Sequence, residues 1–150
     1  MNSQSQPTFH IEKIYLKDLS LEIPNAPDIF LERDAPQIDL QLNTKSQEIN
    51  DGLFEVQLMV TVTAKINDKV MFLVETQQAG IFKIGNVPDK EMAPVLGIGC
   101  PNILFPYLRE TVSDVVTRAG FPPVILNPVN FEAIYNKNQN YDSSESTKTK

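Results

Sequence analysis

Residues 54–66 read Phe-Glu-Val-Gln-Leu-Met-Val-Thr-Val-Thr-Ala-Lys-Ile, and this stretch decides the fold class of the chain. Every even position from Phe54 to Ile66 is apolar, and every odd position except Met59 is polar. Strict alternation is typical of a β-strand, because successive strand side chains point to opposite faces of a sheet. The pattern predicts one long strand with one face in the core and the other face wet or shared with a partner.

Three further strands are predicted around this one. Turn residues at 67–69 close a hairpin, and residues 70–82 form its return strand. The alternating pattern of residues 38–42 predicts a half-buried strand before the turn at 50–52. Residues 9–23 are rich in Ile, Leu and Tyr and hold no helical period, so they predict a long first strand. Four successive strands of this kind indicate an antiparallel sheet.

The rest of the chain separates into a crossover and two helices. Prolines within residues 24–36 predict an irregular, extended crossover, because proline cannot donate to a central strand or a helix interior. Apolar residues recur at three- and four-residue steps over 102–119, which predicts an amphipathic helix that Pro101 starts. Residues 131–135 mark a short second helix. The predicted class is therefore α+β, a four-stranded antiparallel sheet with a long Pro-rich crossover loop, followed by one long and one short helix.

Length and charge restrict the classes of function. The chain has 150 residues and a mass of 16.9 kDa, one domain's worth, with a net charge of −6. That acidity disfavours nucleic acids and anionic membranes, which attract clustered Lys and Arg. A single Cys excludes an internal disulfide, and the first seven residues lack the basic and apolar segments of a secretory signal. We expect a soluble cytoplasmic protein that does not insert into a membrane and does not bind nucleic acid.

The residues that usually carry catalysis are sparse. His10 and Cys100 are the only His and Cys in the chain, so neither a metal site nor a nucleophile–base pair is indicated. Gly97-Ile98-Gly99 lacks the third glycine of a dinucleotide fingerprint, and no phosphate-binding Gly-rich loop with Lys is present. We therefore predict a protein that is not an enzyme and that needs no cofactor and no metal. Its function should depend on its surfaces.

One such surface is acidic. Alternation places Asp18, Ser20 and Glu22 on one face of the first strand. It also places Leu73, Glu75 and Gln77 on one face of the fourth strand. Polar side chains rarely face a core, so these two rows are expected on the solvent side of the sheet.

The stretch Cys-Pro-Asn-Ile-Leu-Phe-Pro-Tyr-Leu-Arg-Glu at 100–110 resembles the SecB protein-export chaperone family. Five shorter blocks support the resemblance in the family's order. They are Ile14-Tyr15-x-Lys17-Asp18, residues 24–27, residues 60–64, Gln77-Gln78-x-Gly80-Ile81-Phe82 and residues 128–131. The similar region spans residues 9–135, which are predicted to form the chaperone domain, between a flexible terminus at 1–8 and a disordered tail at 136–150.

The resemblance implies an ATP-independent holdase that binds unfolded precursor proteins and keeps them competent for translocation. It implies delivery of those precursors to the motor ATPase SecA, through a basic, zinc-bearing tail of the motor. It also implies a homotetramer, a dimer of dimers, with long helices sandwiched between eight-stranded sheets. The family's motor-docking positions correspond here to Asp18, Glu22, Leu73 and Glu75.

Two further sets of residues follow from the resemblance and the apolar pattern. An apolar client-binding groove under the crossover and beside the last helix would use Ile38, Leu40, Leu42, Phe72, Phe131, Ile134 and Tyr135. The apolar stripe of the long helix is broad enough to serve its own sheet and a neighbour. It therefore places an oligomer interface at Leu108, Val112, Val115 and Val116.

Two other functions stay open at this point. A small apolar-ligand-binding β-rich protein would have a closed, pre-formed pocket, would be a monomer or dimer, and would not bind unfolded chains. A SecB-like chaperone dedicated to a toxin–antitoxin pair would have the same groove but one specific client.

Overall fold

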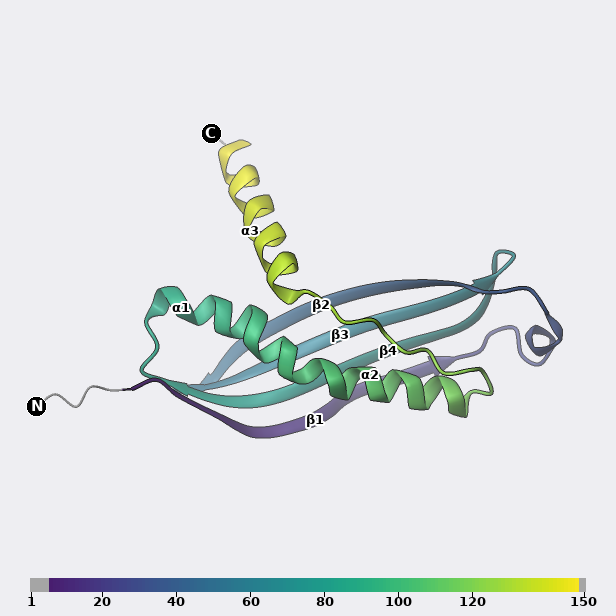
Figure 1. Ribbon diagram of the computed structural model, residues 1–150, viewed down its shortest axis with the longest axis horizontal. Coiled ribbons are helices and arrows are strands. Elements are labelled where there is room, and N and C mark those ends of the chain that lie inside the picture. Colours follow the sequence, from purple (N-terminus) through teal and green to yellow (C-terminus); the bar gives the residue numbers. More distant parts are fainter. Residues whose placement is uncertain (1–5, 149–150) are drawn as a thin grey trace, which may run out of the picture.

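A single four-stranded antiparallel sheet is the frame of the computed structural model, which describes residues 6–148 (Figure 1). The strands are β1 (Thr8–Glu22), β2 (Gln37–Asn50), β3 (Leu53–Ile66) and β4 (Lys69–Gly85). They are ordered β1-β4-β3-β2, so β1 and β2 form the two edges. The predicted sheet and the predicted fold class are confirmed. Residues 1–5 of the predicted flexible terminus lie outside the described part of the chain, and β1 already begins at Thr8.

The core lies between one face of the sheet and helix α2 (Cys100–Arg118). Even-numbered residues of β3 and β4 point into it, as the alternation of residues 54–66 predicts. Helix α2 lies across one face of the sheet (Figure 1) and packs mainly on β4 and β3. The fully buried side chains include Val56, Leu58, Val62, Phe72, Val74, Phe82, Leu104, Leu108, Val112 and Val116.

The helical part begins earlier than predicted. Helix α1 (Asp89–Pro94) continues through a five-residue π-helical turn, η2 (Val95–Gly99), directly into α2. Pro101 lies in the first turn of α2, as predicted, but α2 itself continues the helical run that begins with α1. The reason is local: Pro101 cannot donate a hydrogen bond, and the preceding Cys100 N–H bonds to the Val95 carbonyl five residues back. This wider turn absorbs the disturbance that a proline causes in an α-helix.

The crossover contains one short 3₁₀ helix, η1 (Asp28–Leu31). Its Ile29 is buried in the core, and the Phe30 ring stacks on Phe121 with a centroid distance of 4.9 Å. Phe121 in turn contacts Phe72, with ring centroids 5.2 Å apart. These aromatic contacts fix the crossover beside the segment that follows α2.

Helix α3 (Phe131–Lys148) is longer than the short helix predicted, and it includes residues for which the sequence predicted disorder. The Asn130 side-chain oxygen accepts a hydrogen bond from the Ala133 N–H at 3.0 Å, which caps the first turn. No Gly or Pro follows before Lys148, so nothing in the sequence ends the helix early. The helix projects away from the sheet (Figure 1).

Within residues 6–148, no helix has the combination of length and apolar character that a membrane crossing requires.

Candidate docking and client-binding surfaces

The four predicted docking residues lie together on the outer face of the sheet, the face opposite α2. Glu22 of β1 is directly opposite Leu73 of β4, and Glu75 is opposite Ser20. Asp18 is opposite Gln77 two pairs further along. Directly opposed residues of antiparallel strands point to the same face, so the two rows form one continuous patch. We call Asp18, Glu22, Leu73 and Glu75 the acidic face.

This arrangement depends on two β-bulges in β1. The register gains one extra residue at Glu12 and one at Lys17, where the pairing shifts between Ile11 and Lys13 and between Leu16 and Asp18. Each extra residue reverses the faces of all residues after it. The core-side apolar residues of β1 consequently sit at 9, 11, 14, 16, 19 and 21, in steps of two and three.

A partly exposed charged cluster, centred on the buried Glu55 of β3, lies on the outer face beside the second bulge. The Glu55 carboxylate is 6% exposed and accepts hydrogen bonds from the Tyr15 hydroxyl and from the Lys17 amine at 2.9 and 3.0 Å. Gln47 and Gln57 donate amide hydrogen bonds to it at 3.1 and 2.9 Å. Burial acts to raise the pKa of Glu55, but these hydrogen bonds together have the larger effect and lower the pKa from 4.5 to about 2. Burial and the adjacent Glu55 raise the pKa of Tyr15 to about 12.

The Glu55 cluster makes the stability of the fold sensitive to acid. The pKa of Glu55 is depressed from an ordinary 4.5 to about 2. The stabilisation of the fold by the ionised Glu55 carboxylate is therefore complete above pH 4.5 and is lost as the pH falls towards 2. The shift corresponds to roughly 3 kcal/mol. We expect Glu55→Gln to flatten the pH dependence of the unfolding free energy in this range, measured by urea titration. The exposed Glu48→Gln is the control. An unchanged slope for Glu55→Gln would contradict the assignment.

An apolar groove of about 530 Å³ lies between the crossover and the segment after α2. It is lined by Asp34, Pro36, Ile38, Met71, Phe72 and residues 121–125. Ile38 and Leu40 of the edge strand β2 are 46% and 48% exposed, which is high for side chains of this kind. A second hollow of about 160 Å³ lies between β2 and α3 and is lined by Leu42, Asn43, Thr44, Phe131, Ile134 and Asn138.

The structure divides the predicted groove residues into three groups by their exposure. Ile38 and Leu40 are exposed, whereas Leu42, Ile134 and Tyr135 are half-buried. Phe72 and Phe131 are each 2% exposed and belong to the hydrophobic core. Phe72 and Phe131 therefore support the floors of the two hollows, and the side chains open to contact come mainly from β2.

The predicted interface residues of α2 are placed differently from the expectation. Leu108, Val112 and Val116 are fully buried, and Val115 is nearly so, within this chain's own core. The apolar stripe of α2 packs against the sheet of its own chain, so these four side chains are not on the surface of the protomer. The broad apolar pattern of the helix does not distinguish residues of the core from residues of an interface between protomers.

An exposed apolar stripe that strict alternation does not predict lies instead on β1. Phe9, Ile11, Leu16, Leu19 and Leu21 are exposed on the same face of the sheet as the core, because α2 packs mainly on β4 and β3. The bulges hide this stripe from a search for strict alternation. A step pattern of two and three residues would have revealed it.

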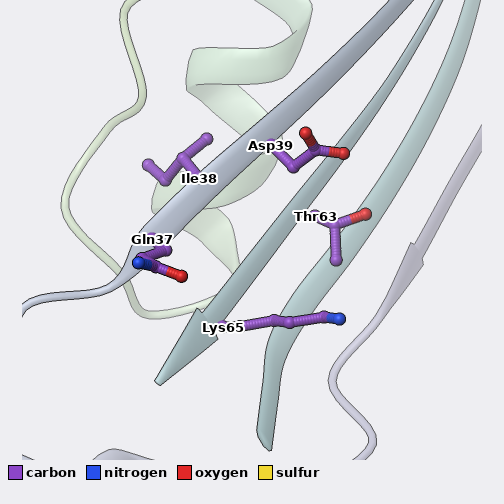
Figure 2. A pocket seen from close by; sticks show the side chains of 5 residues that line it. All are labelled: Gln37, Ile38, Asp39, Thr63 and Lys65. Carbon is purple, nitrogen blue, oxygen red and sulfur yellow. The ribbon is translucent and has the colours of Figure 1, made fainter. Parts of the chain in front are cut away.

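A polar hollow of about 560 Å³ lies where β2 begins and β3 ends (Figure 2). Gln37 is paired with Lys65 and Asp39 with Thr63, while Ile38 is paired with Ala64 and faces the core side. Figure 2 shows Ile38 on the opposite side of β2 from Asp39. The polar hollow and the apolar groove therefore meet at the start of β2, and Ile38 lines both of them.

The residues that could carry catalysis are not brought together in the described part of the chain. His10 is on the exposed outer face of β1, whereas Cys100 is buried at the start of α2. Burial raises the pKa of the Cys100 thiol to about 12, which leaves it protonated and unreactive at neutral pH. Among the described residues, His, Cys, Asp and Glu form no group of three that could hold a metal ion.

Helix α3 is seated on the π-helical turn through a close contact between Tyr135 and Gly97. A Cβ atom added at Gly97 would lie 2.7 Å from the Tyr135 ring, whereas one added at Gly99 meets nothing within 4 Å. Gly97→Ala should therefore displace the start of α3, and Gly99→Ala should not. We expect hydrogen exchange at residues 131–135 to be on the order of tenfold faster in Gly97→Ala alone. Equal exchange in both variants would show that Gly97 does not seat α3.

The fold defines a class of protein with a four-stranded antiparallel sheet that carries two candidate binding surfaces, an apolar groove at one sheet edge and an acidic face. Comparison with known proteins identifies the class. The SecB family, described as preprotein translocase subunit SecB, matches residues 2–142. The protein-export protein SecB of Nitrosospira multiformis is 67% identical over 134 residues, covering 89% of this chain and 84% of that protein. The SecB of Thiobacillus denitrificans is 62% identical over 139 residues, with coverage of 93% and 91%.

The chain belongs to the SecB family and is a protein-export chaperone. A solved structure with the same fold is the SecB-like chaperone Rv1957 of Mycobacterium tuberculosis, in complex with a ChAD peptide from the Rv1956 HigA1 antitoxin. Its TM-score is 0.67 at 18% identity, and the match covers 81% of this chain and 90% of that one.

Proposed function

We propose that this chaperone is an ATP-independent holdase of the cytoplasm. It binds unfolded precursor proteins, keeps them competent for translocation and delivers them to the motor ATPase SecA. The observation that carries the proposal is the separation of the apolar groove from the acidic face. A client and a motor can then occupy different surfaces of one chaperone.

The apolar groove suits an extended, unfolded client. Ile38 and Leu40 alternate along β2, and β2 is an edge of the sheet with one unpaired row of backbone groups. An extended chain can add to such an edge by main-chain hydrogen bonds while its apolar side chains enter the groove. Main-chain pairing does not depend on sequence, so this mode accepts many clients.

The acidic face suits a basic partner. Asp18, Glu22 and Glu75 are exposed, and Leu73 is half-buried between them as an apolar contact. Like charges gathered on one flat surface attract a basic segment and raise its association rate. The basic, zinc-bearing tail of SecA has the required charge, and its zinc would belong to the partner.

The exposed apolar stripe on β1 supports assembly into the tetramer implied by the family. A second copy that joined its β1 edge to this one would extend the sheet to eight strands and would bring apolar surface to the stripe. This surface replaces the buried α2 residues as the interface between protomers. Two such dimers packed through the outer sides of their α2 helices would complete the tetramer.

The proposal is tested by a slowly folding precursor protein diluted from denaturant with and without the chaperone. We expect aggregation measured by light scattering to be suppressed at stoichiometric chaperone, equally with and without ATP. Size measurement of the chaperone should give about four times the protomer mass of 16.9 kDa. Aggregation that continued unchanged, or suppression that required ATP, would contradict the holdase assignment.

The other two functions are less well supported. Identity of 67% and 62% to the proteins named protein-export protein SecB contrasts with 18% identity to the antitoxin-binding relative. Export therefore accounts for this chain better than service to a toxin–antitoxin pair. A small-ligand carrier is also disfavoured, because the family assignment extends over nearly the whole chain.

A further inference from the structure

The position of the acidic face depends on one extra residue in β1. Leu16 is paired with Gln78 and Asp18 with Gln77, so Lys17 is the additional residue of a bulge. Without it, the residues from Asp18 to Glu22 would each turn to the opposite face of the sheet. Asp18 and Glu22 would then face the core side, and Leu19 and Leu21 would face outward.

The Lys17 side chain is held by the buried carboxylate of Glu55. Its amine contacts both carboxylate oxygens, at 2.9 and 3.0 Å, and Tyr15 of the same strand donates its hydroxyl to Glu55. Glu55 is on β3, so these contacts reach across β4. Ala79 of β4 is paired with both Tyr15 and Gln57. Its small side chain leaves room for the side chains of Tyr15 and Lys17 to cross β4 and contact Glu55.

A second hydrogen bond holds the backbone at the same place. The Gln78 side-chain amide donates to the Tyr15 carbonyl at 3.1 Å, from the core side of the sheet. The bulge is thus fixed from both faces, although a bulge locally disrupts the ladder of backbone hydrogen bonds. Of the residues that make these hydrogen bonds, Lys17 alone is the extra residue of the bulge.

We propose that Lys17 and Glu55 are the positioning pair of the acidic face, holding β1 in the bulged register that turns Asp18 and Glu22 outward. This inference rests on the proposed docking of a basic motor element at that face. The pair does not touch the motor in this proposal. It acts through the register of residues 18–22.

Charge and position make opposite predictions for Lys17. Lys17 carries a positive charge on the face that attracts a basic partner, so its removal should strengthen binding if charge alone matters. If Lys17 positions the acidic residues, its removal should weaken binding even though the face becomes more acidic. Lys13, on the same strand and face, is exposed and is opposite Ile81, so Lys13→Met is a matched control for charge.

The experiment compares full-length Lys17→Met, Lys17→Arg and Lys13→Met for affinity to purified SecA by calorimetry. We expect Lys17→Met to bind about tenfold more weakly. Lys17→Arg should restore most of the affinity, because a guanidinium can also bind the Glu55 carboxylate. Lys13→Met should bind as tightly as the parent or more tightly. Hydrogen exchange should accelerate at residues 17–22 in Lys17→Met, but not in β3.

Several results would overturn the inference. They are binding by Lys17→Met equal to that of Lys13→Met, unchanged exchange at residues 17–22, or an equal loss of client holding, which would indicate general damage. If Lys17→Met does not fold, Tyr15→Phe removes one hydroxyl from the same cluster and should give faster exchange at residues 17–22 with weaker SecA binding. A folded Tyr15→Phe with parental exchange and affinity would then overturn it.

A parallel Glu75→Lys variant separates this inference from the proposed function. If Glu75→Lys loses SecA binding and Lys17→Met does not, the docking face stands and the positioning pair is wrong. If both variants bind SecA normally, the docking face itself is wrong.

Discussion

Val112→Asp should abolish folding rather than only separate subunits. The Val112 side chain of α2 is 0% exposed and packs against the chain's own sheet. Burying an unpaired carboxylate costs several kcal/mol, which is comparable to the whole stability of a domain of this size, about 5–15 kcal/mol. We expect the variant to lose its cooperative unfolding transition, measured by circular dichroism during urea titration.

The matched control is Asn102→Asp, which places the same charge on an exposed position of the same helix. It should unfold within about 0.5 kcal/mol of the parent. A Val112→Asp protein that folded with parental stability but had a smaller solution mass would contradict the core assignment. That result would return Val112 to an interface between protomers.

Glu75→Lys should remove most of the affinity for SecA while leaving the fold intact. Glu75 is exposed on the outer face, opposite Ser20, so its replacement disturbs no core contact. Each exposed ion pair contributes only up to about 1 kcal/mol, but charge reversal replaces attraction by repulsion beside Asp18 and Glu22. We expect at least about a tenfold loss of affinity by calorimetry. The parent's affinity should itself weaken as salt is raised, because exposed charges are screened.

Asp51→Lys makes the same change of net charge at the turn between β2 and β3, at the other end of the sheet. It should bind SecA as the parent does, which separates a local patch from a general effect of charge. Equal losses in both variants would mean that total charge, rather than the acidic face, governs the interaction.

The sequence predicted the sheet well because β3 alternates without interruption. Each even residue from 54 to 66 is apolar, and a pattern with period two leaves one register in which all of them are buried. The same reasoning placed the acidic residues together on one face.

The bulges of β1 could not be predicted in the same way. Apolar residues at 9, 11, 14, 16, 19 and 21 follow neither a strand period nor a helix period. The extra residues at 12 and 17 are visible only once the partner strand β4 is known. The cluster that holds Lys17 joins residues 38 positions apart, so no local pattern contains it.

The helices show a second limit of sequence reasoning. Pro101 predicted the start of α2, but the sequence did not predict that a π-helical turn, η2, joins α2 to the preceding helix α1. The four apolar residues assigned to an interface are core, because a stripe on a helix does not reveal which sheet it packs against.

The separation of the client groove from the acidic face is tested most directly by titrating SecA into the chaperone saturated with an unfolded, fluorescently labelled precursor. Separate surfaces predict that SecA binds the loaded chaperone with an affinity close to that for the empty one, while the precursor stays bound. A ternary complex should then be seen by size measurement. Stoichiometric release of the precursor by SecA alone, without nucleotide, would contradict two separate surfaces and would place both partners in one site.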